Sequence, residues 1–300
     1  MILNELGIVL VTGVLQGSVY ALVALGIVLV HRASGVFNFA QAEFGTVALF
    51  GAYAALTLWG WSYPMSILFG LLLAVAMGLL TERLVIHPLR DHSRVTLLVG
   101  TAGVALAVIG LQFWQFNDTL IMSMPKIHDG FYVTPFGAPV SVQQMITLGV
   151  LVVVTISLAL FFRSPSGLAI QAAQQEPTAA ELVGISVRQV SMATWAIAAL
   201  LGGLAGVLSG PNTTFTAGFL TFGAGRALLP GFMAAVLAGM KSMPGAVIGG
   251  LVVGVVEQLG SLTVFVEVPG ARAAMLFVFL LGVLLIRPQG LFVGRAVAAA

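Results

Sequence analysis

The sequence contains no cysteine, and charged residues are scarce. Only 7% of its 300 residues are Asp, Glu, Lys or Arg, against about 25% in a typical soluble domain. The missing cysteines exclude a disulfide framework and thiolate chemistry. The net charge of +2 is too small to indicate a nucleic-acid partner. We expect no metal site, because the four histidines lack the close spacing of metal ligands; they are His31, His87, His92 and His128.

Motifs for nucleotide hydrolysis and for catalysis are absent as well. A phosphate-binding loop has the form G-x-x-x-x-G-K-[ST], because its backbone amides and its lysine hold the phosphates. Lys241 is followed by Ser242, but Met240 stands where the glycine is required, and Lys126 precedes Ile127. The sequence also lacks a nucleophile elbow and an HExxH pattern. We therefore expect a chain that is not an enzyme and binds no cofactor, so that partner subunits must hydrolyse ATP if ATP drives it.

Apolar residues dominate what is present. They make up 59% of the chain, and crossing a bilayer takes about 20 of them in a row. The sequence predicts an all-α, polytopic membrane bundle of about eight or nine transmembrane segments. No connection is long enough for a core of its own, so residues 1–300 are expected to form a single transmembrane domain. The apolar stretches are 6–30, 36–59, 64–81, 95–116, 143–162, 190–210, 226–240, 244–260 and 272–286.

The orientation follows from the positive charges. If residues 82–94 are cytoplasmic, nine of the twelve Lys and Arg residues lie inside, as the positive-inside rule requires. The N-terminus is then outside and the C-terminus inside. Stretches 226–240 and 244–260, separated by a break at Pro244, either each cross the membrane or together form a re-entrant hairpin. Both alternatives leave the two ends on the same sides.

Three polar residues lie close together in the second apolar stretch. They are Asn38, Gln41 and Glu43, and a carboxylate at the bilayer centre costs roughly 2.5–3.5 kcal/mol. At about 100° per residue, Asn38 and Gln41 share one helix face and Glu43 points elsewhere. Asn38 and Gln41 either line a translocation path or hydrogen-bond neighbouring helices, and we favour the path. Glu43, protonated or paired, either braces neighbouring helices, which we favour, or belongs to the path.

A second carboxylate, Glu257, lies near the outer end of stretch 244–260. Charges inside a membrane usually pair, so we expect a structural ion pair with Arg226 or Arg272. Glycines also recur at a spacing of four residues, which allows helix backbones to approach closely. We interpret these glycines as packing positions; they include Gly13 and Gly17, Gly202 and Gly206, and Gly250 and Gly254.

The inner connection 163–189 is the second informative segment. Small, helix-favouring residues run from Gly167 to Gln175, Pro177 interrupts them, and a second short helix follows over 178–183. The side chains of this segment are too small to anchor it in lipid. They favour docking of a cytoplasmic partner over a plain solvated connection. It is the predicted coupling loop.

Five segments resemble one known family, the integral-membrane permease subunits of bacterial branched-chain amino acid ABC importers. The first span is similar to residues 15–30, and the most distinctive motif to SGVFNFAQAEFGTVALFGAY at 34–53. The coupling loop of the family resembles GLAIQAAQQEPTAAELVGI at 167–185. Its C-terminal signature resembles residues 233–257 together with LIRPQGLFVG at 285–294.

Two departures from the family pattern stand out. The usual His-Gly pair is Gln41-Ala42 here, so a titratable ring has become a neutral amide. The coupling helix usually carries Arg where this chain has Gln171. These changes concern the transported compound more than the fold, and urea, short amides and other small carboxylates are plausible alternatives to a branched-chain amino acid.

The resemblance implies a heteromeric importer in the bacterial inner membrane. A second, related permease chain pairs with this one, two cytoplasmic ATP-binding subunits dock on the coupling loops, and an external binding protein delivers the solute. The residues expected to couple to the ATPase are Gly167, Gln171, Ala172, Glu176, Ala180 and Gly184. The rival interpretation is a stand-alone secondary transporter or channel, which broken segments and the carboxylates Glu43 and Glu257 permit.

Overall fold

The computed structural model describes residues 2–116, 121–265, 267–287 and 289–292. Arg295 and parts of the motif at 285–294 therefore lie outside the described residues. The longer helices are α1 (Ile2–Ser34), α3 (Tyr63–Thr81), α5 (Arg94–Phe116), α6 (Val142–Phe161) and α9 (Val187–Ser209). The shorter helices are α2 (Gln41–Tyr53), α4 (His87–Leu89), α7 (Pro165–Gln175), α8 (Pro177–Leu182), α10 (Leu228–Leu237), α11 (Met243–Leu259) and α12 (Ala271–Ile286).

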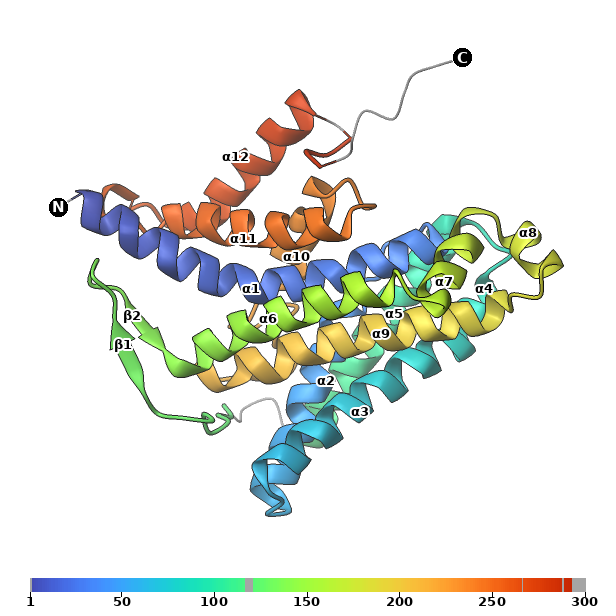
Figure 1. Cartoon of the computed structure of the whole chain (residues 1–300). Coiled ribbons are helices and arrows are strands. Elements are labelled where there is room, and N and C mark those ends of the chain that lie inside the picture. The colour runs from blue at the N-terminus through green and yellow to red at the C-terminus, as the bar shows by residue number, and fades with distance from the viewer. Residues whose placement is uncertain (1, 117–120, 266, 288, 293–300) are drawn as a thin grey trace.

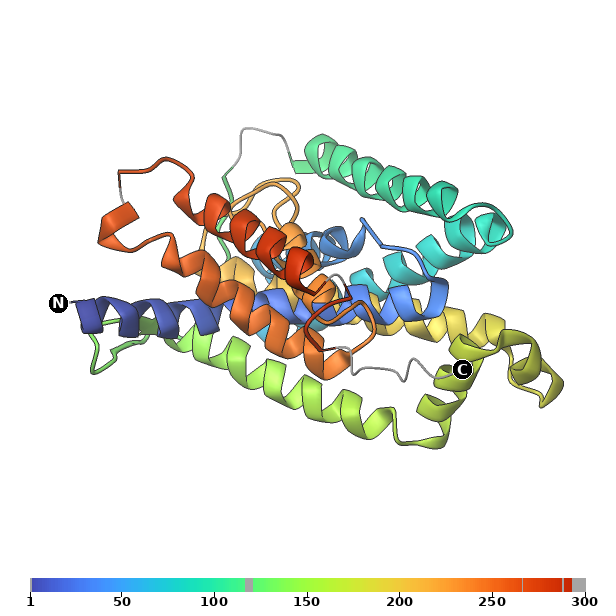
Figure 2. The same ribbon diagram turned by 90° about the horizontal axis from the view of Figure 1, so that it is seen from above.

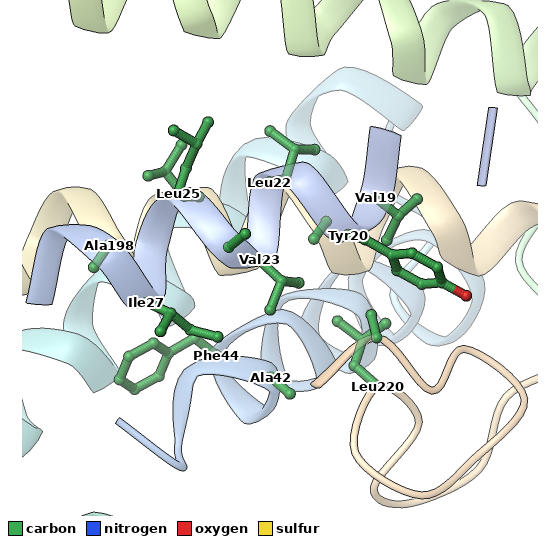
Figure 3. Close-up of a cluster of buried hydrophobic side chains, with 14 of the residues drawn as sticks. Val19, Tyr20, Leu22, Val23, Leu25, Ile27, Ala42, Phe44, Ala198 and Leu220 are labelled. Atoms are coloured by element: carbon green, nitrogen blue, oxygen red, sulfur yellow. The ribbon is translucent and has the colours of Figure 1, made fainter. Parts of the chain in front are cut away.

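Helix α1 is the central element. It packs against α11, α9, α10 and α6, and Figure 1 shows it running the length of the molecule between α11 on one side and α6 and α9 on the other. Its residues from Val19 to Val30 are buried on every face, as expected for a helix that is apolar all round. Figure 3 shows its contacts with Ala42 and Phe44 of α2, Ala198 of α9 and Leu220.

In the part of the chain that the structure describes, five helices are long and apolar enough to cross a membrane: α1, α3 with its helical extension to Leu89, α5, α6 and α9 with its extension to Asn212. The prediction of a mostly helical, polytopic membrane protein is confirmed at this level. On α3, α5 and α6, large apolar side chains face outward, among them Leu72, Leu106 and Val153. A lipid surface accounts for their exposure.

Two segments are discontinuous rather than regular spans. The expected helix over 36–59 begins only at Gln41, because the chain turns at Gly35 (φ 67°) and is non-helical through Ala40. The expected stretch 226–240 contains only α10, whose ten residues measure about 15 Å against a hydrocarbon core of about 30 Å. Before α10, residues 213–227 form an irregular segment, the α10 loop, in which Phe219 and Leu220 are fully buried.

Glycines permit the closest helix contacts, as the four-residue spacing predicted. A Cβ at Gly254 would overlap with the backbone of Gly13 and Gly17, where α11 meets α1. A Cβ at Gly206 would overlap with the backbone of Gly45, where α9 meets α2. These glycines are packing positions.

The connections at the two ends of the bundle differ. At the end where α1 begins, a short antiparallel hairpin, β1 (Phe131–Val133) and β2 (Pro139–Ser141), precedes α6; the sequence did not predict it. At the opposite end lie α4, α7 and α8 (Figure 1). Residues 82–89, expected within a loop, are helical and include a π-helical turn over Glu82–Ile86. Viewed from above, α5 and α6 lie on opposite sides of the bundle (Figure 2).

Candidate functional site

Asn38 and Gln41 lie together at the start of α2, and both are fully buried. Asn38 accepts from the Ala40 N–H at 3.0 Å and donates to Gln41 Oε1 at 3.4 Å. The Gln41 amide then donates to the Ala198 carbonyl of α9 at 2.8 Å. Non-helical backbone inside a membrane needs such partners, because lipid offers none. In this conformation both side chains therefore bind the protein's own backbone, and their role in a translocation path stays a prediction.

Glu43 faces a different part of the bundle, as the helical phase predicted. Its side chain is fully buried and accepts from the Gln112 amide of α5 at 2.8 Å and from the Thr221 hydroxyl at 2.5 Å. Gln112 in turn accepts from the Gly218 N–H at 2.8 Å. One turn along α2, the Thr46 hydroxyl accepts from the Leu220 N–H at 3.3 Å. Glu43 is thus the centre of a network, the Glu43 network, that ties the α10 loop to α2 and α5.

Glu257 lies beside a cavity of about 740 Å³ between the α10 loop, α10, α11 and α12, which we name the α10–α12 cavity. Its carboxylate accepts from the hydroxyl of Tyr20 on α1. The predicted ion pair is wrong: among the described residues, no Lys or Arg nitrogen lies within 4.0 Å of Glu257. Arg226 and Arg272 instead line the same cavity. Within the described residues, the three charged side chains therefore line one cavity without an ion pair between them.

Backbone contacts position the charges of the α10–α12 cavity. A Cβ at Gly260 would meet the Cα of Arg272 at 2.6 Å, so glycine lets the end of α11 touch the first turn of α12. Glu257 precedes this contact by one helical turn. Thr221 also lines the cavity, and through its hydroxyl the cavity wall is connected to the Glu43 network.

The predicted coupling segment forms two short helices, α7 and α8, interrupted before Pro177 as expected. Its six candidate residues divide into two groups. Ala172, Glu176 and Gly184 are exposed, and a partner can reach them. Gly167 and Ala180 are buried, and the Gln171 amide donates to the Phe162 carbonyl at 2.7 Å, which fixes α7 on the end of α6.

Sequence reasoning missed Tyr20, Gln112 and Thr221. Gln112 carries a readable signal, because it is an uncharged polar residue within an apolar stretch. Tyr20 and Thr221 carry none, since their roles depend on contacts with Glu257 and Glu43 over 200 and 170 residues away in the sequence. Within the described part of the chain, no group of three or more His, Asp or Glu residues is placed to hold a metal ion.

Comparisons with known proteins agree with this architecture. A family model described as "Branched-chain amino acid transport system / permease component" matches residues 9–287. The chain is 31% identical to the high-affinity branched-chain amino acid transport system permease protein LivH of Salmonella typhimurium, covering 93% of this chain and 92% of the relative. It is also 31% identical to the permease protein BraD of Pseudomonas aeruginosa, covering 94% of each.

A solved structure shares the fold. The structure of PsaBC from Streptococcus pneumoniae in complex with Fab superposes with a TM-score of 0.50 at 15% identity, covering 93% of this chain and 91% of that chain. At this identity the likeness concerns the fold alone. The match of the family model over most of the sequence carries the assignment: the chain belongs to the family of permease components of branched-chain amino acid transport systems.

Proposed function

We propose that this protein is the membrane permease subunit of an ATP-driven importer for branched-chain amino acids or a related small polar solute. The observation that carries the proposal is the family match over residues 9–287. The sequence contains no phosphate-binding loop, so partner subunits supply the ATP hydrolysis. The subunit lies in the bacterial inner membrane, with its N-terminus outside and its C-terminus inside.

The assembly that we propose contains a second, related permease chain, two cytoplasmic ATP-binding subunits and an external substrate-binding protein. The ATP-binding subunits dock on α7 and α8. Exposed apolar side chains at the tip of this pair, Leu182 and Val183, support the docking role, since Leu182 is 85% exposed. In this arrangement α10, too short to cross the membrane alone, forms a re-entrant element with the α10 loop.

Transport by a defined complex tests this function. The chain is co-expressed with the ATP-binding and binding-protein subunits from its own genome and reconstituted into vesicles, and uptake of labelled leucine is measured with and without ATP. We expect ATP-dependent uptake that requires all components. Uptake by the purified chain alone, driven by an ion gradient, would instead establish the rival secondary transporter.

Two substitutions test the docking surface. Ala172→Arg and Leu182→Glu alter exposed positions of α7 and α8, and we expect both to abolish leucine uptake and its coupling to ATP hydrolysis while the protein still inserts. His92→Arg is the matched control and is expected to transport normally. His92 is exposed and follows α4 in the sequence, and α4 lies at the same end of the molecule as α7 and α8 (Figure 1). Normal coupling in both docking variants would contradict the role of α7 and α8.

A further inference from the structure

The α10–α12 cavity combines unlike charges with an apolar wall. Two guanidinium groups, from Arg226 and Arg272, and one carboxylate, from Glu257, line a volume of about 740 Å³. This volume lies within the roughly 300–1,000 Å³ of ordinary ligand sites. Its apolar lining includes Met233, Leu276 and other side chains of α10 and α12, among them Phe277.

The charged groups of the cavity have not neutralised one another. Within the described residues, neither arginine has a carboxylate within 4.0 Å, and the partner of Glu257 is the neutral hydroxyl of Tyr20. Charges in a membrane protein usually pair or face water, because lipid solvates them poorly. Here they face a common space, so a ligand that enters it can pair with each of them.

The arrangement matches a zwitterion. A guanidinium binds a carboxylate through parallel N–H donors, and a carboxylate accepts hydrogen bonds from an ammonium group. Two arginines and one glutamate in the wall of one cavity therefore supply the groups that an α-carboxylate and an α-ammonium group require. The apolar wall complements an aliphatic side chain, whose burial contributes about 0.8 kcal/mol per CH₂ group.

We propose that the α10–α12 cavity is a binding station for a zwitterionic amino acid with an apolar side chain, in which Arg226 and Arg272 bind the carboxylate and Glu257 binds the ammonium group. The station rests on the proposed transport function and extends it, because it assigns the recognition to residues outside the distinctive segment at 34–53. Thr221 connects the station to Glu43, and through Glu43 to α2 and α5.

Transport kinetics of the complete reconstituted complex test the charged residues. For Arg226→Gln, Arg272→Gln and Glu257→Gln we expect the half-saturating concentration of leucine to rise roughly tenfold to hundredfold, the range for loss of one hydrogen bond between charged partners. Arg90→Gln removes a cation that lies outside the cavity, in an exposed pair with Asp91, and is expected to change nothing. Wild-type kinetics in all three cavity variants would overturn the proposal.

Direct occupancy can be measured because the chain has no native cysteine. Ala273→Cys places one thiol in the cavity wall, and Lys126→Cys places one at an exposed position outside it. We expect leucine to slow modification of the Ala273→Cys protein by a charged thiosulfonate. Isocaproate, which lacks the ammonium group, and leucinamide, which lacks the carboxylate, are expected to protect poorly. The Lys126→Cys protein should react at the same rate with and without leucine.

The outcomes separate this proposal from the transport function. If the wild-type complex transports leucine but leucine gives no protection in the cavity, the station is wrong and the transport function stands. Equal protection by isocaproate would contradict recognition of a zwitterion and would indicate a site for anions. If the wild-type complex shows no ATP-dependent uptake of an amino acid or of another small polar solute, the proposed function itself fails.

Discussion

Two polar regions of this bundle differ in whether their polar side chains are buried and hydrogen-bonded within the protein or exposed to a cavity. Around α2, the side chains of Asn38, Gln41 and Glu43 are fully buried, and protein donors and acceptors satisfy them. In the α10–α12 cavity, Arg226 and Arg272 are exposed to an open space.

A polar residue in an apolar span therefore does not by itself indicate a solute path. Non-helical backbone needs hydrogen-bond partners inside a membrane, and the segment before α2 and the α10 loop both contain such backbone. Asn38 accepts from the Ala40 N–H before α2, while Thr46 and Gln112 accept from backbone N–H groups of the α10 loop. Among the described residues, the Arg226 and Arg272 side chains of the cavity form no ion pair within 4.0 Å, which makes them the better candidates for binding a solute.

Because Glu43 is buried and hydrogen-bonded, we expect its replacement to cause the largest loss of folding stability. Glu43→Leu leaves the buried Gln112 amide and the half-buried Thr221 hydroxyl without their acceptor. At about 1–3 kcal/mol for an unsatisfied buried group, and less for the half-buried hydroxyl, the free energy of unfolding should fall by roughly 1–4 kcal/mol. Denaturant unfolding in detergent measures this loss. Glu43→Gln keeps one acceptor oxygen in a side chain of the same size and should lose less stability. A Glu43→Leu protein as stable as the wild type would contradict the structural role of the Glu43 network.

A pair of glycine substitutions compares the tight contact of α9 with α2 with an open position on α12. Gly206→Ala places a methyl group against the Gly45 carbonyl in the contact of α9 with α2, and such overpacking costs about 1–3 kcal/mol. Gly282→Ala on α12 meets nothing within 4 Å. It should be neutral or stabilise by up to about 1 kcal/mol, because alanine favours helix over glycine. Equal melting temperatures of the two variants would show that the α2 region is not the rigid one.

Substitutions of Gln41 distinguish between the two interpretations of Asn38 and Gln41, namely a translocation path and hydrogen bonding between helices. Gln41→Ala removes the bonds to Asn38 and to the Ala198 carbonyl, and we expect a loss of about 1–3 kcal/mol in stability with unchanged preference among leucine, isoleucine and valine. Gln41→His, the residue that the family resemblance places here, can retain one ring N–H donor and should lose less. A changed substrate preference at normal stability would instead support a role of Gln41 in the translocation path.

The sequence predicted the helical membrane fold, the packing glycines and the two helices of the coupling segment, because each follows from local composition and spacing. It predicted that Glu43 would lie apart from Asn38 and Gln41, since helical phase is also local. It failed where distant segments meet. The partner of Glu257 is Tyr20, whereas the tendency of charges inside a membrane to pair favoured an arginine. Likewise, apolarity extended the second span back to residue 36, although Gly35 and Asn38 turn the chain there.

Among the substitutions expected to destabilise the protein, Tyr20→Phe gives the smallest loss of stability. The substitution removes one hydroxyl, which donates to Glu257 and accepts from Gln16 at 3.1 Å, and should cost about 1 kcal/mol or less, the net value of an ordinary hydrogen bond. If the Glu257 carboxylate serves a ligand, losing the donor that orients it should still raise the half-saturating concentration of leucine. A loss of stability as large as that of Glu43→Leu, with unchanged transport kinetics, would place Glu257 among the structural groups instead.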